Sequence, residues 1–118
     1  MQHRLIDVPH FTDDRGTLSV VEDILPFKVE RIYWITNTNE KLRGGHAHKV
    51  TRQALVSLGG KSVINIKKAN ASTNIILDSP TKMLILEPDD WHTMKISFGT
   101  TLLVFASHKY DEQDYVHD

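Results

Sequence analysis

The run 43–49, RGGHAHK, is the densest group of chemically capable side chains in the chain. Within it, His46 and His48 are two residues apart and follow a pair of glycines. Side chains alternate between the two faces of a β-strand, so two histidines at this spacing point the same way. The glycines before them allow the backbone to turn sharply. Two imidazoles on one face beside Arg43 form either half of a metal site or an acid/base pair in a pocket.

Proton transfer is a chemistry that this pair could perform without a metal. Imidazole titrates near neutral pH, so each ring can take a proton from carbon or oxygen and return it. Two rings on one face could serve adjacent atoms of one substrate. Arg43 and the hydroxyl of Tyr33 could stabilise the charge of an enolate. A plainer reading is that His46 and His48 only line the rim of a sheet.

Short runs rich in β-branched and aromatic residues recur along the chain, separated by glycine, proline and aspartate. No segment carries a long helical repeat of apolar residues. Gly59 and Gly60 predict a hairpin turn, since glycine supplies the positive φ that tight two-residue loops require. Many short strands at even spacing favour an antiparallel sandwich or barrel. The predicted strands span residues 17–21, 29–36, 53–58, 61–67, 73–77, 82–86, 93–96 and 101–107.

Composition narrows the class of protein. At 118 residues the chain is expected to form one domain, 1–118, around a single core. The formal net charge of -1 gives no electrostatic reason to expect a nucleic-acid or membrane-surface partner. The absence of cysteine excludes a disulfide framework, a thiolate nucleophile and a cysteine-ligated zinc. The sequence has no apolar run of the ~20 residues that span a membrane and no secretory signal at its N-terminus, so we expect a cytoplasmic domain.

A glycine-led His-x-His motif that opens a strand in a small all-β chain resembles the first motif of the cupin superfamily. The segment 87–92, EPDDWH, corresponds to the second cupin motif and supplies His92, so three histidines could in principle bind zinc or iron. Metal-binding cupins also place a glutamate four or five residues after the histidine pair, where this chain has Arg52 and Gln53. Arginine cannot ligate a metal, and a neutral glutamine is a poor substitute for a carboxylate. We therefore expect no functional metal.

The resemblance extends over nearly the whole chain to one family, the dTDP-4-keto-6-deoxyglucose 3,4-ketoisomerases, which are WxcM-like, FdtA-type cupins. The chain departs from the family pattern at Gly45, where an aromatic residue is often found, at Thr93, where a glutamate is common, and in its short C-terminus. The segments that carry the resemblance are 14–18 (DRGTL), 31–35 (RIYWI), 43–49 (RGGHAHK), 88–92 (PDDWH) and 110–115 (YDEQDY).

The resemblance implies a cupin-type antiparallel β-barrel or jelly roll and a reaction that needs no cofactor. A base removes the proton on sugar C3, an enediol forms, and C4 is reprotonated, so the carbonyl of a dTDP-linked keto-deoxysugar moves from C4 to C3. His46 and His48 are the implied acid/base pair, and the spacing does not divide the two steps between them. The family also implies a homodimer that shares an N-terminal strand, and an open sheet has edges that need covering.

Six residues are candidate substrate contacts. The family pattern implies Tyr33 and Arg43 as pocket partners and Arg15 beside the sugar or pyrophosphate. His92 is expected to line the pocket and hydrogen-bond the substrate. Trp91 is expected at a sheet rim, where an indole packs or stacks on a sugar or base. Lys49 is a weaker candidate for a phosphate contact, because its strand parity is opposite to that of the histidines.

Two other functions stay open at this point. One is a non-catalytic cupin module that binds a sugar or sugar nucleotide, and the other is a metal-dependent cupin oxygenase or isomerase. A binding module has no need of two imidazoles aimed at one point, so the histidine pair favours an enzyme. The remaining histidines are interpreted as surface residues without convergent partners; they are His3, His10, His108 and His117.

Overall fold

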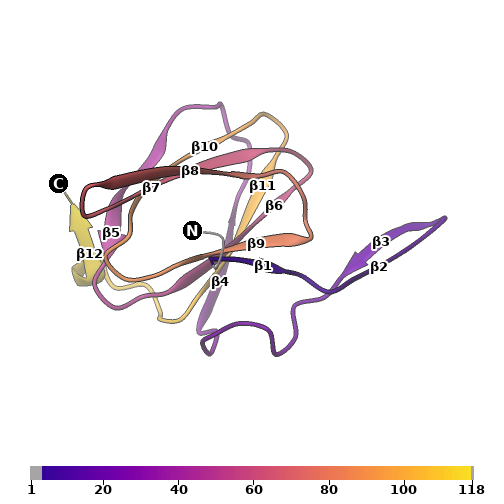
Figure 1. Ribbon diagram of the computed structural model, residues 1–118, viewed down its shortest axis with the longest axis horizontal. Coiled ribbons are helices and arrows are strands. Elements are labelled where there is room, and N and C mark those ends of the chain that lie inside the picture. Colours follow the sequence, from indigo (N-terminus) through magenta and orange to yellow (C-terminus); the bar gives the residue numbers. More distant parts are fainter. Residues whose placement is uncertain (1–3, 118) are drawn as a thin grey trace.

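A computed structural model describes residues 4–117, and its elements are almost all β-strands (Figure 1). Among these residues, no helix has the length and apolar character needed to cross a membrane. The elements are β1 (Leu5–Asp7), β2 (His10–Asp13), β3 (Gly16–Ser19), β4 (Arg31–Ile35), β5 (Arg43–His48), β6 (Gln53–Leu58), β7 (Ser62–Lys68), β8 (Ala71–Leu77), β9 (Lys82–Leu86), β10 (Trp91–Ile96), β11 (Thr101–Ala106), the 3-10 helix η2 (Glu112–Asp114) and β12 (Tyr115–His117).

Two five-stranded sheets pack face to face, with the strand orders β1-β9-β6-β11-β4 and β12-β5-β10-β7-β8. Neighbouring strands in both sheets are antiparallel. The predicted all-β, cupin-type jelly roll is confirmed. All eight predicted strands exist, with ends that differ from the observed ones by two residues or fewer. Three short strands, β1, β2 and β12, were not predicted, and β5, which carries the histidine pair, was expected as a strand but given no bounds.

The predicted hairpin at Gly59 and Gly60 is wrong. Strand β6 pairs with β9 and β11, and β7 pairs with β8 and β10, so the two glycines connect opposite sheets. Gly59 does have the positive φ that the prediction required, at 78°. Gly60 is needed for a different reason, because a Cβ there would lie 2.0 Å from Oγ1 of Thr100. The sequence therefore predicted the positive φ at Gly59 correctly but predicted the wrong pairing for the two strands that the glycines connect.

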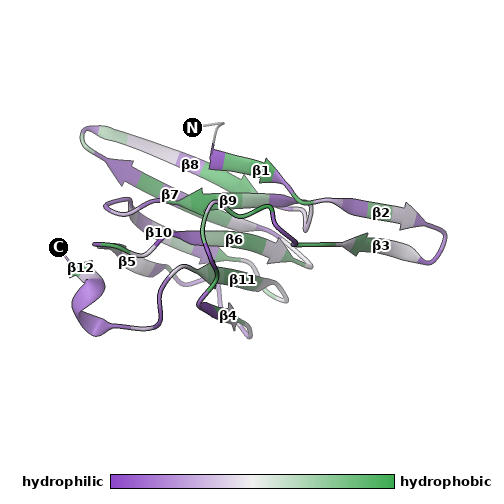
Figure 2. Ribbon diagram, turned by 90° about the horizontal axis from the view of Figure 1, so that it is seen from below, coloured by the Kyte–Doolittle hydropathy of each residue, from purple (hydrophilic) through white to green (hydrophobic). Residues whose placement is uncertain are grey.

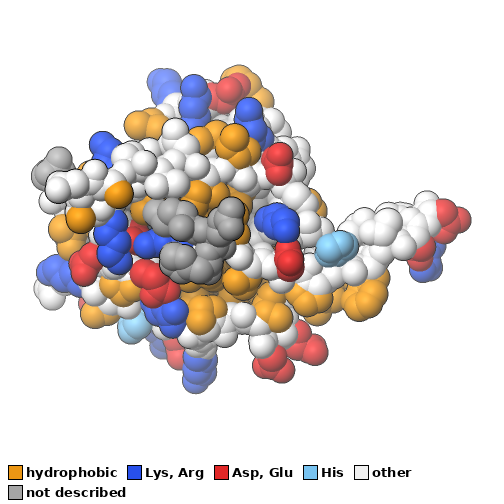
Figure 3. All heavy atoms as spheres, viewed as in Figure 1, with side chains coloured by type: hydrophobic (Ala, Val, Ile, Leu, Met, Phe, Trp, Pro, Cys, Tyr) orange, Lys and Arg blue, Asp and Glu red, His pale blue; other side chains and the backbone are white. Residues whose placement is uncertain are grey.

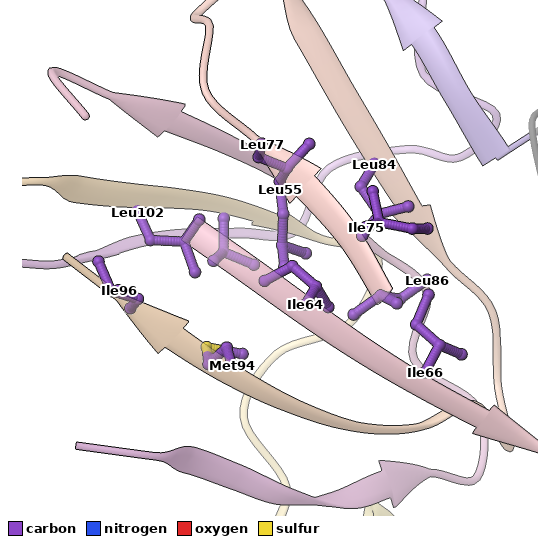
Figure 4. Packing of buried hydrophobic residues seen from close by; sticks show 11 residues of the cluster. Leu55, Ile64, Ile66, Ile75, Leu77, Leu84, Leu86, Met94, Ile96 and Leu102 are labelled. Atoms are coloured by element: carbon purple, nitrogen blue, oxygen red, sulfur yellow. The ribbon is translucent and has the colours of Figure 1, made fainter. Parts of the chain in front are cut away.

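The main core fills the space between the two sheets (Figure 4). Strand β7 alternates buried and half-buried residues, as expected for a strand with one face on a core. Strand β6 is buried on both faces, because Leu25, Phe27 and Val29 pack a second cluster against the outer side of its sheet. The main core consists of Leu55, Ile64, Ile66, Ile75, Leu77, Leu84, Leu86, Met94, Ile96, Leu102 and Val104.

Strands β2 and β3 form a hairpin that projects away from both sheets (Figures 1 and 2). Its cross-strand pair Phe11 and Leu18 is 67% and 64% exposed. Figure 3 shows the hairpin standing clear of the body, with charged side chains of both signs at its far end. An isolated two-stranded hairpin is at best marginally stable in water, so this arm lacks the packing that would hold it.

At the C-terminus, the chain returns to the sheet that carries the histidine pair. Helix η2 leads into β12, which lies along β5 (Figure 2). The register places Tyr115 opposite His48 and His117 opposite His46. The polar tail therefore forms the edge of the sheet beside both histidines.

Candidate active site

The two glycines before the histidines allow β5 to approach β10 closely. Gly44 and Gly45 have φ values of 87° and 82°, which only glycine adopts readily. A Cβ on Gly44 would lie 2.9 Å from the carbonyl oxygen of His92, where β10 bulges between His92 and Thr93. Beyond this point His46 pairs directly with His92 across the two strands. The glycines thus set the register that brings these imidazoles together.

A cavity of about 180 Å³ lies between β4 of one sheet and β5 and β10 of the other. The structure brings four of the predicted site residues to this cavity, namely Tyr33, Arg43, His46 and His92. Its full lining is Arg31, Tyr33, Ile35, Arg43, Gly44, His46, His92, Met94 and Tyr115.

His46 is the centre of an aromatic cluster. Its ring centroid lies 5.3 Å from that of His48, 5.0 Å from His92 and 4.8 Å from Tyr115. The short distance between the His46 and His48 rings agrees with the prediction that both side chains point the same way. Burial, together with the neighbouring imidazoles of His92, His48 and His117, lowers the pKa of His46 to about 4. The ring is therefore neutral at physiological pH, which is the state a proton acceptor needs.

His48 lies behind His46 and is buried, with 5% of its surface exposed. Its Nδ1 is 2.9 Å from Oδ2 of Asp114, whereas its Nε2 is buried without a hydrogen-bond partner in the described structure. Leaving a buried polar atom unpaired costs roughly 1–3 kcal/mol, so such atoms are uncommon in folded proteins. Burial alone would raise the pKa of Asp114, but hydrogen bonds from Thr51, Val50 and His48 outweigh it and lower this pKa to about 2. Of the pair His46 and His48, it is His48 that has a carboxylate as hydrogen-bond partner.

Tyr33 presents its phenol to the same cavity. Nε2 of Gln53 donates a hydrogen bond of 2.9 Å to the Tyr33 oxygen, and the guanidinium of Arg31 lies 4.5 Å from the centre of the ring. Burial and the neighbouring Tyr115 raise the pKa of Tyr33, with Arg31, Gln53 and Arg43 acting in the opposite direction. The side chain is therefore a neutral phenol at physiological pH and can donate a hydrogen bond to a substrate oxygen.

His92 is held from behind by a hydrogen bond to the backbone of a turn, and that turn is fixed by an ion pair. Its Nδ1 lies 3.1 Å from the carbonyl oxygen of Asp90, and burial lowers its pKa. The Asp90 carboxylate is fully buried and paired with Arg4, and Nζ of Lys68 lies 3.6 Å away. The turn that carries His92 is thereby tied to the start of the chain.

The lining does not fit the ligand set of a metal-binding cupin. Arg52 faces the outer side of its sheet, where it pairs with Glu87 at 2.7 Å and donates to the carbonyl of Pro26 at 2.6 Å. Gln53 is engaged with Tyr33. The lining listed above includes two histidines and two arginines but no carboxylate. Within residues 4–117, no group of three or more His, Cys, Asp or Glu side chains is arranged to hold a metal ion.

Three predicted contacts lie away from this cavity. Arg15 is at the exposed tip of the β2–β3 arm, where it pairs with Asp13 at 2.5 Å. Lys49 is exposed after the end of β5, as its parity predicted. Trp91 is half-buried at the start of β10, and its indole lies 4.0 Å from where a Cβ of Gly45 would be. In a single chain none of the three lines the cavity.

The sequence did not reveal several neighbours of the histidines. Asp114 and Tyr115 were noted only as part of the family segment 110–115, and Arg31 only as part of segment 31–35. The interpretation of His117 as a histidine without partners is wrong, since its ring centroid lies 5.9 Å from that of His46. His10 and His108 are exposed as predicted, and His3 lies outside the described residues.

Comparison with known proteins places this geometry in a family. The family FdtA, described as WxcM-like, C-terminal, matches residues 1–118. A TDP-4-oxo-6-deoxy-alpha-D-glucose-3,4-oxoisomerase of Aneurinibacillus thermoaerophilus is 38% identical over 120 residues, covering 98% of this chain and 86% of the relative.

Solved structures agree in both fold and sequence. A variant of the 3,4-ketoisomerase QdtA from Thermoanaerobacterium thermosaccharolyticum, in complex with TDP-4-keto-6-deoxyglucose, superimposes with a TM-score of 0.93 at 35% identity, over 97% of this chain and 86% of that one. The WlaRB TDP-quinovose 3,4-ketoisomerase of Campylobacter jejuni gives a TM-score of 0.91 at 32% identity, over 97% and 91% of the two chains. The chain is therefore an isomerase and belongs to the WxcM-like FdtA family of sugar-nucleotide ketoisomerases.

Proposed function

We propose that this isomerase moves the carbonyl of dTDP-4-keto-6-deoxy-D-glucose from C4 to C3, as a step in deoxysugar biosynthesis. The observation that carries the proposal is the cavity in which His46, Tyr33 and Arg43 converge, in a chain 38% identical to an oxoisomerase of the corresponding TDP-sugar. The QdtA variant in complex with this keto sugar adds support.

The reaction needs one proton acceptor and one proton donor. The C3–H bond breaks, its electrons form a double bond between C3 and C4, and the C4 carbonyl oxygen becomes a hydroxyl. C4 then gains a proton while the C3 hydroxyl loses one and becomes the carbonyl. No electrons leave the sugar, so no redox partner is required. Arg43 and the phenol of Tyr33 stabilise the negative charge that develops on the sugar oxygens.

The different surroundings of the two histidines suggest how they divide the steps. His46 lines the cavity and is neutral, with a pKa of about 4, so we assign it the removal of the C3 proton. His48 lies directly behind it, beside the carboxylate of Asp114. Because the carboxylate accepts a hydrogen bond from Nδ1, a ring that also carries a proton on Nε2 becomes a neutral imidazole when it gives that proton to C4, and we assign His48 this delivery.

Nuclear magnetic resonance in deuterated water tests the proposal. The protein is incubated with dTDP-4-keto-6-deoxyglucose, and the sugar protons are followed. We expect the C3 proton signal to disappear and a 3-keto product to form that carries deuterium at C4. Tight binding of the nucleotide sugar with no loss of the C3 proton would instead support a non-catalytic binding module.

We also propose that the protein is a homodimer in which the β2–β3 arm of each subunit packs on its partner. The exposed pair Phe11 and Leu18 gives the arm an apolar surface that no part of residues 4–117 covers. Strand β4 leaves a sheet edge open and exposes Trp34, at 61%. Arg15, at the tip of the arm, would then lie against the neighbouring subunit, where its proposed contact with substrate becomes possible.

The assembly is tested by light scattering at micromolar concentration. Wild type should have the mass of a dimer, and the double variant Phe11→Ser/Leu18→Ser should dissociate. Ile76→Ser serves as a control, because Ile76 is a similarly exposed apolar residue, at 57%, on β8 in the body of the protein. A monomeric wild type that retains activity would contradict the proposal.

Trp91 and Lys49 are proposed as outer contacts of the nucleotide sugar. The half-buried indole beside Gly45 has an apolar face for a sugar or base, and exposed Lys49 follows the histidine strand directly. Trp91→Ala and Lys49→Ala should weaken dTDP binding in calorimetry and leave the turnover number within a few fold. A loss of turnover at saturating substrate would argue for a different role.

A further inference from the structure

Asp114 lies buried between the C-terminal tail and the turn that follows β5, with 7% of its surface exposed. Both of its carboxylate oxygens are fully used. Oδ1 accepts hydrogen bonds from the backbone N–H groups of Lys49, at 3.1 Å, and Val50, at 2.8 Å. Oδ2 accepts from Nδ1 of His48, at 2.9 Å, and from the hydroxyl of Thr51.

We propose that Asp114 is a positioning residue that keeps a proton on Nδ1 of His48 and so leaves Nε2 as the only ring nitrogen for proton transfer. This inference rests on the proposed function, in which His48 delivers a proton to C4. Asp114 does not line the cavity and acts only through the histidine. The unpaired, buried Nε2 lies on the opposite edge of the ring from this contact.

The two backbone N–H groups fix the orientation of the side chain at position 114. A backbone N–H cannot become an acceptor, so whatever group faces Lys49 and Val50 must be an oxygen. In an Asp114→Asn variant, the amide oxygen would therefore take the position of Oδ1, and the NH₂ group would take that of Oδ2. The NH₂ group would donate to Nδ1 of His48, and the hydroxyl of Thr51 can rotate to accept its second hydrogen.

The substitution should therefore move the ring proton of His48 from one nitrogen to the other, rather than merely weaken a contact. Nδ1 would become an acceptor, and the proton would move to Nε2. Delivery of the Nε2 proton from this singly protonated ring would leave an imidazolate, whereas a ring that also holds a proton on Nδ1 is left neutral by the same step. Because the two side chains have nearly the same shape, the packing around η2 and β12 is preserved.

The first experiment uses the wild-type protein and does not depend on activity. Long-range ¹⁵N–¹H spectra of the histidine side chains distinguish a protonated from an unprotonated Nδ1, and His48→Asn identifies the His48 signals. We expect Nδ1 of His48 to carry a proton in wild type and to lack one in Asp114→Asn. An unprotonated Nδ1 in wild type would overturn the proposal even if the enzyme is fully active, and a protonated one would support it even if the reaction proves to be another.

The second experiment measures catalysis. In Asp114→Asn we expect kcat to fall by ~10²–10⁴, the usual worth of a positioned proton donor, with KM within threefold of wild type. The C3 proton should still exchange with solvent, because His46 is untouched. Equal losses of exchange and turnover, or unchanged turnover, would refute the positioning role.

Two further variants control for folding. Asp111→Asn makes the same change three residues earlier, at the exposed cap of η2, where the carboxylate accepts from the backbone of Gln113 at 3.0 Å; its turnover should stay within about twofold. Thr51→Val removes one donor from Oδ2 without placing an N–H opposite Nδ1. If Asp114→Asn does not fold, Thr51→Val decides the matter, since it should keep the wild-type proton on Nδ1; loss of that proton would count against Asp114.

Discussion

The low pKa of His46 predicts an unusual dependence of activity on pH. A general base acts in its neutral form, so a lowered pKa moves the acid limb of the kcat/KM profile to lower pH. At pH 5.5 a histidine with the ordinary pKa of 6.5 would be about 9% neutral, whereas a pKa of about 4 leaves it about 97% neutral. The structure thus predicts nearly full kcat/KM at pH 5.5, where an ordinary histidine would have lost about tenfold.

The assay measures initial rates from pH 8 to pH 4.5 at substrate concentrations well below KM. A parallel sample held at each pH and returned to pH 7.5 before assay corrects for any irreversible loss of folded protein. His117→Gln removes one of the imidazoles that lower the pKa, so its acid limb should move toward higher pH. An acid limb with its midpoint near 6.5 in folded wild-type protein would refute both the pKa and the assignment of His46 as the base.

Three further predictions concern the site and its support. His46→Asn and His48→Asn should each lower turnover by ~10²–10⁴ with little change in nucleotide-sugar binding, and the double variant should lose less than the product; only His46→Asn should abolish exchange at C3. Arg4→Met leaves the buried Asp90 carboxylate without its main partner and should cost about 3 kcal/mol in urea unfolding, whereas a loss below 1 kcal/mol would show that the charge is solvated. EDTA should leave turnover unchanged, and activity restored by metal after chelation would favour the metal-dependent alternative.

The parts of the fold that could be predicted are those with a strong local signal. Strands β6 and β9 were predicted with their observed ends, because both are apolar runs bounded by polar or turn residues. Strands β1, β2 and β12 have three or four residues each, too few to establish a period. These segments are strands because they pair with neighbouring strands, and their own sequences do not reveal it. The error at Gly59 and Gly60 has the same cause, since the sign of φ is local but the choice of partner strand is not.

In the site, the sequence identified residues whose type is rare and whose spacing is distinctive. His46, His92 and Tyr33 meet at one cavity, whereas His48, the other member of the pair, is buried behind His46 and does not line it. Asp114 could not be recognised in this way. It lies in the polar run 111–114, DEQD, where nothing local separates a buried carboxylate from three exposed neighbours. Only the pairing of β12 with β5 brings it to His48, 66 residues earlier in the chain.

The proposed division of labour between the two histidines depends on neighbours that their spacing does not reveal. In the sequence His46 and His48 are equivalent, with the same side chain and the same strand parity. In the fold, burial and the neighbouring imidazoles disfavour the charged form of His46, while Nδ1 of His48 lies 2.9 Å from the carboxylate of Asp114. Both sets of neighbours come from distant segments, β10 and the C-terminal tail. The proposed roles of acid and base therefore depend on the tertiary structure, and we expect a substitution in the C-terminal tail, such as Asp114→Asn, to change the chemistry of His48 without altering the histidine motif.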